Sequence, residues 1–466
     1  MRTFDPKFNL TSPKMKRMFT KVAGYTLFIS LIIAGYNGNA QTTQASADTQ
    51  SKEVKLDAPE VKAAPKPAED TSWKPQRRIW GYAFGDFYYA AHTDAGTGAR
   101  GPETNYAGVP TYRNAFQFRR IYLGYDYEIT KRFKAEFLLE SAPSASTGVA
   151  NANTATLQNG DNLVDGKMAF YIKNINIRYR DLWNGTDLVV GEMSTPGFAL
   201  NEAGTNGPTS LSETTWGNRF IEKTVSDFHK TNSYDVGAAL QGTFDPKTKN
   251  FGYVLMVGDN TQASLLSAAT ANTGFYKILY GSLWGKFFDK HLLVDIYADH
   301  VRTGPATATI GGQSHGMFKG FVAYTSPKLT VGVEAYTQKL TNGVTNSTTK
   351  LPEDATAQAL SIFVKGPIIK DKLSFFARYD GYNPDKDYAG ADTYAATAGI
   401  FSSYTPLYKE KFYTAGLDIT PIKNVHFSPN IWYVSYKDQR DSGVTGRVAD
   451  DHTLVYRMTF YFVFGK

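Results

Sequence analysis

Residues 454–466 read LVYRMTFYFVFGK, and this stretch at the end of the chain decides the fold. In an extended strand, successive side chains point to opposite faces. Arg457 and Thr459 then lie on one face, and the other face is wholly apolar, formed by Leu454, Tyr456, Met458, Phe460, Phe462 and Phe464. A membrane-spanning β-strand has this arrangement, with lipid on one side and a watery lumen on the other. The alternative is an edge strand of a soluble β-sandwich.

The composition favours the membrane-spanning interpretation. Aromatic residues make up 14% of the chain, with 30 Tyr, 30 Phe and 41 Gly, although the mean hydropathy is −0.35. Alternating strands with aromatic girdles have such a composition. No apolar run of about 20 residues follows the N-terminal region, so no transmembrane helix is expected. The absence of cysteine from the sequence excludes disulfides, thiol catalysis and cysteine-based zinc sites. We therefore predict an all-β, transmembrane antiparallel β-barrel.

Residues 1–40 have the pattern of a secretory signal peptide. A basic region precedes the apolar segment 22–35, and Gly38-Asn39-Ala40 supplies small residues for cleavage. The apolar segment is too short to span a membrane, although a membrane anchor is the alternative. Met15 is an alternative true start. Removal of residues 1–40 lowers the formal charge from +7 to about +2, so no nucleic-acid partner is expected.

Residues 41–76 differ in character from the rest of the mature chain. They are rich in Ala, Pro, Lys, Glu, Thr and Ser, and contain no aromatic residue before Trp73. Such a segment cannot bury enough apolar surface to fold alone. We predict a disordered periplasmic tether here, with binding of peptidoglycan or a partner as the alternative, and a barrel over residues 77–466.

The barrel region repeats one unit, a strand followed alternately by a short turn and a long loop. The sequence predicts about sixteen strands, at 77–92, 114–128, 133–141, 168–181, 186–193, 234–244, 251–258, 273–286, 290–301, 316–325, 329–340, 357–366, 373–382, 408–420, 425–437 and 451–464.

The alternation of connection lengths supports a closed barrel. Ile129–Arg132 and Ser326–Lys328 are short polar turns, whereas Ser144–Gly166 is a long connection rich in small residues. Transmembrane barrels have short periplasmic turns and long outer loops. An even strand number places both ends of the barrel region in the periplasm, and closure leaves no unpaired edge in lipid.

Several short motifs in this region resemble the phosphate-selective porin O and P family and, more loosely, a wider set of outer-membrane porins. They are Phe118–Gly124 (FRRIYLG), Val190–Phe198 (VGEMSTPGF), Arg219–Lys223 (RFIEK) and Gly416–Asp418 followed by Thr420-Pro421. The resemblance implies a channel in the outer membrane of a Gram-negative bacterium. It also implies passive diffusion of small hydrophilic solutes or anions such as phosphate, outer-membrane lipid as a partner and, by analogy, a homotrimer. Gln41 directly after the cleavage site resembles secreted proteins of Bacteroidetes.

The longest predicted loop, Thr195–Asn232, is the third outer loop. In sixteen-stranded porins, this loop folds into the lumen and narrows the pore. The resemblance therefore makes Arg219, Glu222, Lys223 and His229 candidates for a constriction. An exposed surface loop is the alternative.

Strand alternation places charged side chains of both signs inside the barrel. These further pore-lining candidates are Arg120, Arg178, Arg180, Arg378, Asp380 and Arg457. Rings of fixed charge set ion preference in narrow pores. Residues 77–466 contain about 39 basic and about 36 acidic residues, hardly an excess of either sign. Mild anion selectivity, non-selective diffusion and a dedicated sugar channel all remain open.

Two rival functions are a barrel-embedded hydrolase and a closed structural or adhesive barrel. The seven histidines occur singly, without HExxH, GxSxG or metal-ligand spacing. Asp299 and His300 are adjacent and form a candidate catalytic dyad, although such a pair is more often a satisfied hydrogen bond. We predict no enzyme activity, no catalytic residue, no cofactor and no metal.

Overall fold

The computed structural model describes residues 73–94, 106, 109–141, 170–198, 210–229, 233–259, 276–304, 312–346, 348–390, 394–396, 407–444, 446–447 and 449–465. The predicted signal peptide, and the predicted tether up to residue 72, lie outside these residues. The chain divides into two units, residues 1–69 and 70–466, and all of the described residues belong to the second.

Nearly all of the described chain is β-strand, because apolar and polar side chains alternate along it. The strands are β1 (Gln76–His92), β2 (Asn114–Glu128), β3 (Phe133–Ser141), β4 (Tyr171–Trp183), β5 (Thr186–Ser194), β6 (Tyr234–Thr243), β7 (Phe251–Gly258), β8 (Ile278–Phe287), β9 (Leu292–Gly304), β10 (Gln313–Thr325), β11 (Thr330–Asn346), β12 (Pro352–Ile369), β13 (Leu373–Asn383), β14 (Tyr394–Ala396), β15 (Tyr408–Ile422), β16 (Val425–Asp438) and β17 (Asp451–Phe464). Two short helices, α2 (Leu211–Trp216) and α3 (Val225–His229), lie between β5 and β6.

The strands form a closed antiparallel ring. With β14 set aside, each strand pairs with its neighbours in sequence, and β1 pairs with both β2 and β17, so that Gly81 opposes Phe464 at the closing seam. Of the seventeen strands in the sheet, β14 pairs only with β11 and stands outside the ring, which therefore has sixteen strands. The predicted barrel is confirmed, and β14 is an addition that the sequence pattern did not indicate. No helix in the described residues is long and apolar enough to cross a membrane.

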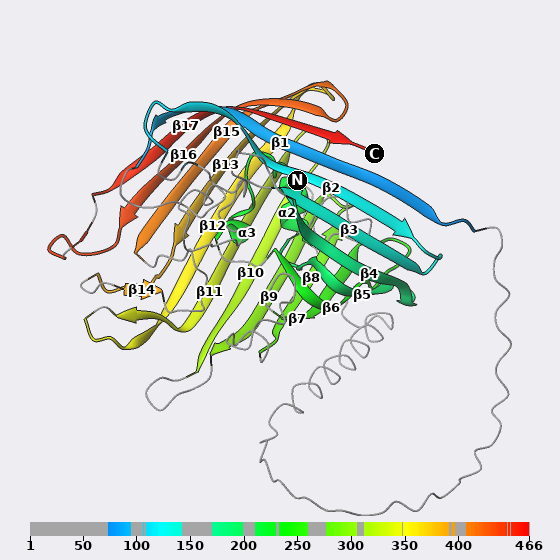
Figure 1. Ribbon diagram of the computed structural model, residues 1–466, viewed down its shortest axis with the longest axis horizontal. Coiled ribbons are helices and arrows are strands. Elements are labelled where there is room, and N and C mark those ends of the chain that lie inside the picture. Colours follow the sequence, from blue (N-terminus) through cyan, green and yellow to red (C-terminus); the bar gives the residue numbers. More distant parts are fainter. Residues whose placement is uncertain are drawn as a thin grey trace, which may run out of the picture. The chain divides into compact units, whose positions relative to one another are not determined.

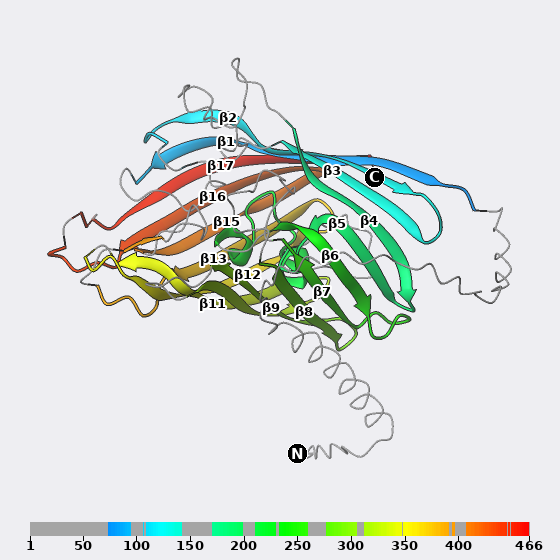
Figure 2. The same cartoon turned by 60° about the horizontal axis from the view of Figure 1, so that its bottom comes forward.

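The two ends of the ring differ. The turns between β2 and β3, β4 and β5, and each later pair up to β15 and β16 are short, and we call this the turn end. The first strand begins and the last strand ends there. The opposite end, the loop end, carries the long connections, including the one that contains α2 and α3. Figures 1 and 2 both show these helices surrounded by the strands.

Side chains of β17 alternate as the sequence predicts. Tyr456 and Met458 are exposed on the outer face, whereas Val455, Arg457 and Thr459 are buried on the inner face. The same outward exposure of large apolar side chains recurs around the ring, in strands from β1 to β17. This outer surface suits a hydrocarbon environment.

A bulge in β2 breaks the alternation. The register with β1 shifts between Phe84, which pairs with Arg120, and Gly85, which pairs with Phe118. The extra residue, Arg119, is therefore buried on the inner face together with Arg120. A bulge allows two consecutive side chains to point the same way, which simple alternation does not anticipate.

Candidate functional site

The segment between β5 and β6 folds into the ring of strands, and we call its described residues, 195–198 and 210–229, the inward loop. Its first helix, α2, begins at Ser210, whose hydroxyl accepts a hydrogen bond from the backbone N–H of Glu213 at 3.4 Å. A Ser-x-x-Glu sequence is a common helix start. The helix ends at Gly217, whose φ of 63° lies in the left-handed region that favours glycine.

Arginines of the wall hold the loop backbone on one side. The guanidinium of Arg119 donates to the carbonyl oxygens of Phe220 and, at 3.2 Å, of Ile221. Arg457 on β17 donates to the same Ile221 carbonyl at 3.3 Å. All three contacts are buried, and a hydrogen bond from a charged donor contributes about 1.5–3 kcal/mol. The loop turn at 220–221 is thus fixed between β2 and β17.

Basic residues on the opposite strands hold the other side. Arg378 on β13 donates to the carbonyl of Lys223, and Lys365 on β12 donates to the carbonyl of Trp216 at 2.7 Å. On β10, the ammonium group of Lys319 lies 3.1 Å from the hydroxyl of Ser212.

Carboxylates complete the attachment. Glu334 on β11 accepts from the backbone N–H of Ser226 at 3.1 Å. Glu222 in the loop accepts from the indole N–H of Trp432 on β16 at 3.0 Å. The loop is therefore hydrogen-bonded to strands around much of the ring. These buried hydrogen bonds order the loop in the same way that they order polar groups in a protein core.

Within the loop, a buried ion-pair network surrounds Arg219. Its guanidinium lies 3.2 Å from Glu213 and 2.9 Å from Asp227, and Lys223 lies 3.6 Å from Asp227. Burial alone would raise the pKa of Asp227, but the neighbouring Lys223 and Arg219 hold it well below its usual range. Burial raises the pKa of Glu213 and lowers that of Lys223. Asp227 is therefore the carboxylate that the network stabilises most in its ionised form.

Aromatic residues pack the turn-end side of the loop. Trp216 is fully buried and contacts Phe363 and Phe376, with ring centroids 5.3 and 6.3 Å apart. Phe220 stacks on Tyr461 at 4.8 Å with nearly parallel rings. These contacts seat the loop against an apolar layer of the inner wall.

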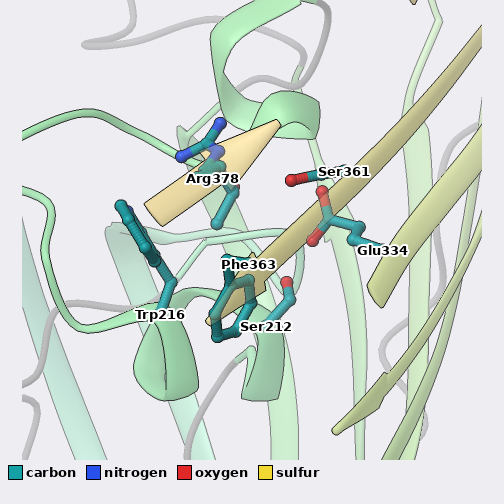
Figure 3. Close-up of a pocket in the computed structure, with 7 residues that line it drawn as sticks. Ser212, Trp216, Glu334, Ser361, Phe363 and Arg378 are labelled. Carbon is teal, nitrogen blue, oxygen red and sulfur yellow. The ribbon is translucent and has the colours of Figure 1, made fainter. Parts of the chain in front are cut away.

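A small cavity remains beside α2 (Figure 3). Trp216, Phe363 and Arg378 line it together with the polar groups of Ser212, Thr224, Glu334 and Ser361. It has room for about one water molecule, which such polar walls would bind. It is too small to be a solute-binding site.

The structure brings some of the predicted residues together around the loop. Arg219, Glu222 and Lys223 lie on the inward loop, and Arg378 and Arg457 contact it from the wall. Asp380 forms a bidentate pair with Arg378, with N–O distances of 2.8 and 2.5 Å. Arg120 pairs with Glu140 on β3, and His229 ends α3.

The other two predicted arginines lie apart, towards the turn end. Arg178 pairs with Asp187 at 3.2 Å and donates to Gln241 at 3.0 Å. Arg180 pairs with Glu128 at 2.7 Å at the rim. Neither arginine has a described contact with the inward loop. Their ion pairs and hydrogen bonds join neighbouring strands of the barrel wall instead.

Charges around the loop are closely balanced. The cations are Arg119, Arg120, Lys173, Arg219, Lys223, Lys319, Lys365, Arg378 and Arg457, one more than the anions. The anions are Asp86, Glu140, Glu213, Glu222, Asp227, Asp295, Glu334 and Asp380. Balanced fixed charge of this kind gives little net potential for sorting ions.

Several site residues were missed by the sequence analysis. The sequence does contain a feature that could have identified Arg119. Strict alternation would place this arginine at a lipid-facing position of an otherwise apolar face, and such a position indicates a bulge. Lys319 and Lys365 lie on the inner faces of their strands, but alternation alone does not say what they contact. Asp299 and His300 form no catalytic dyad. Asp299 accepts from Tyr297 at 2.5 Å and from the backbone of Met317, whereas His300 is exposed on the same face as Ile296 and Ala298.

Comparison with known proteins supports this class of fold. No protein-family model and no curated protein matches the chain. Among solved structures, the outer membrane channel DcaP of Acinetobacter baumannii has a TM-score of 0.50 at 11% identity, with 84% of this chain and 97% of that chain covered. An anion-selective porin from Comamonas acidovorans (TM-score 0.48, 12% identity, 84% and 100% covered) and Salmonella typhi OmpF in complex with daunomycin (0.49, 12%, 83% and 97%) are also similar. The sixteen-stranded antiparallel barrel of this chain is thus similar in fold to the DcaP channel.

Proposed function

We propose that this protein is an outer-membrane channel for passive diffusion of small hydrophilic solutes, in which the inward loop sets the size of the passage. The observation that carries the proposal is the loop itself, bonded inside a closed barrel by Arg119 and Arg457 on one side and Arg378 on the other. A loop held in this way narrows the bore of the barrel. The fold shared with outer-membrane channels supports the same function.

Ion selectivity follows from the balance of charge. The loop cations Arg219 and Lys223 are matched by Glu213 and Asp227, so we propose weak selectivity rather than a strong anion preference. Phosphate selectivity and membership of the phosphate-selective porin O and P family stay predictions from the short motifs. We also propose outer-membrane lipid as the surroundings of the barrel and, by analogy, a homotrimer. An origin in Bacteroidetes stays a prediction from Gln41.

Planar-bilayer recording tests the proposal. The purified wild-type chain is expected to give small, steady conductance with a reversal potential near zero under a KCl gradient. The variant Arg119→Ala/Arg457→Ala frees the Ile221 carbonyl from both strands and is expected to give larger and noisier conductance. Arg132→Ala, an exposed arginine in the turn before β3, is the matched control and should behave as wild type.

A second pair of variants tests selectivity. Arg219→Ala and Lys223→Ala each remove one basic partner of Asp227 and are expected to shift the reversal potential towards cations. If neither the well-folded wild type nor the loop-released variant conducts ions, the channel is contradicted and a closed structural or adhesive barrel is favoured. Strong anion preference that is lost in Arg219→Ala contradicts weak selectivity.

A further inference from the structure

A group of potential metal ligands lies at the loop end of the seam where the barrel closes. His92 is the last residue of β1, and Asp451 and His452 are the first two residues of β17. Their nearest ligand atoms all lie within 4.8 Å of one another. The sequence separates His92 from the other two by almost the whole barrel, so ligand spacing gave no sign of the group.

The contacts within the group are specific. Nε2 of His92 lies 2.8 Å from Oδ1 of Asp451, and Nδ1 of His452 lies 3.4 Å from the same oxygen. The two imidazole rings are stacked, with centroids 4.2 Å apart and planes 26° from parallel. One carboxylate oxygen therefore faces one nitrogen from each ring.

These distances fit the coordination shell of a small divalent metal. Zinc binds imidazole nitrogen and carboxylate oxygen at about 2.0–2.2 Å, so neighbouring ligands of a tetrahedral ion lie about 3.3 Å apart. The observed separations of 2.8 and 3.4 Å bracket that value. Side-chain rotation can bring the two ring nitrogens closer, because all three side chains are between 35% and 40% exposed.

We propose that His92, Asp451 and His452 form a binding site for a late first-row divalent transition metal that joins β1 to β17. Imidazole nitrogen favours zinc, copper and nickel, and three protein ligands leave a position for water. The position gives the metal a structural effect. The β1–β17 register shifts between Ala90 and His92, and the ladder ends where His92 pairs with Leu454. A metal there would join β1 to β17 at the point where their hydrogen-bonded pairing ends.

The site is separate from the inward loop. His92 pairs with Leu454, on the outward face of β17, and His452 shares that face and contacts Tyr433 at 5.4 Å. The inference therefore stands or falls independently of channel activity, and its test requires no transport measurement.

Titration with ZnCl₂ tests the site on the full chain, purified in detergent without a histidine tag. We expect one zinc ion per chain and an upward shift in the midpoint of heat unfolding, because a ligand that binds only the folded state stabilises it. His92→Gln and His452→Gln should each weaken zinc binding by more than about tenfold, since even outer-shell partners contribute that much. His291→Gln, an exposed histidine at the turn end, is the matched control and should bind zinc as wild type does.

Electron paramagnetic resonance with Cu²⁺ gives a readout of the ligands themselves. Nitrogen hyperfine coupling from two imidazoles in wild type, reduced in each histidine variant, supports the site. Equal zinc affinity in wild type and in His92→Gln/His452→Gln overturns it, as does a Cu²⁺ spectrum without nitrogen coupling. Heat-modifiable electrophoretic mobility establishes that each variant is folded before it is compared.

Discussion

The two faces of β17 meet very different surroundings. On the outer face, Tyr456 and Met458 are 47% and 41% exposed. On the inner face, Arg457 is 4% exposed and bonds both Asn430 and the inward loop. The inner face is thus packed like a protein interior at the level of the loop. The comparison teaches that the loop is part of the barrel's structure. Substitutions on the inner face should therefore lower the free energy of unfolding far more than equal substitutions on the outer face or the rim.

Removal of Arg378 should have the largest effect. It is buried, forms a bidentate pair with Asp380 and bonds the Lys223 carbonyl. Arg378→Ala takes the basic partner of a buried carboxylate away, so we expect a loss of about 3–5 kcal/mol in the free energy of unfolding. Urea unfolding followed by tryptophan fluorescence in detergent measures it.

Two further variants sharpen that test. Arg378→Ala/Asp380→Ala removes both charges and should recover part of the loss, because the buried carboxylate is removed together with its basic partner. Lys339→Ala removes an exposed partner of Asp354 and should change stability by at most about 1 kcal/mol. Equal losses for Arg378→Ala and Lys339→Ala would show that the inner face is not packed.

A charge on the outer face tests the other half of the comparison. Met458 lies outward near the middle of β17, opposite Phe87. Met458→Arg should cost about 2–4 kcal/mol in a lipid bilayer, because a charge at mid-membrane loses its water. Unfolding of the protein in phospholipid vesicles measures the loss, and Met458→Leu should cost little. A cost that is no greater in vesicles than in detergent would mean that this face does not meet lipid.

The sequence predicted the strands of the barrel wall well, but it predicted the contacts of the inward loop poorly. Alternation is a local signal, so it correctly placed Arg457 and Thr459 inside and Tyr456 outside. It failed at Arg119, where one inserted residue turns the side chain inward.

Contacts of the loop depend on residues far apart in the chain. Glu222 meets Trp432, and Trp216 meets Lys365, and no periodicity connects these positions. The resemblance to porins predicted that the third outer loop turns inward, but not that Arg219 and Lys223 would be paired within the loop. Charge that looks free in the sequence is thus largely neutralised in the fold.

The two carboxylates around Arg219 should respond differently to replacement. Nearby cations lower the pKa of Asp227, so its ionised form stabilises the fold, whereas burial raises the pKa of Glu213, so its ionised form costs stability. At pH 7, Asp227→Asn should lose about 1–3 kcal/mol, and Glu213→Gln should be close to neutral.

The pH dependence separates these carboxylates further. The contribution of Asp227 is present above about pH 4, the ordinary value of an unfolded aspartate, and is lost as the pH falls through its lower folded value. The difference between Asp227→Asn and wild type should therefore shrink in acid. Urea unfolding at pH 7 and at successively lower pH measures it. A constant difference across this range would contradict the assigned pKa direction.

The pair between Arg180 and Glu128 should have the smallest effect, although its two hydrogen bonds, of 2.7 and 3.2 Å, look as good as those of Arg378. Its side chains are 26% and 29% exposed at the turn end, where water screens the charges. A double-mutant cycle with Arg180→Ala and Glu128→Ala should give a coupling of about 0–1 kcal/mol that falls as salt is added. The same cycle on Arg378 and Asp380 should give a larger coupling that salt hardly changes, because water and ions do not reach that pair. Similar salt dependence in both cycles would mean that water and ions reach the pair of Arg378 and Asp380 as freely as the rim, and the burial of this pair would have to be abandoned.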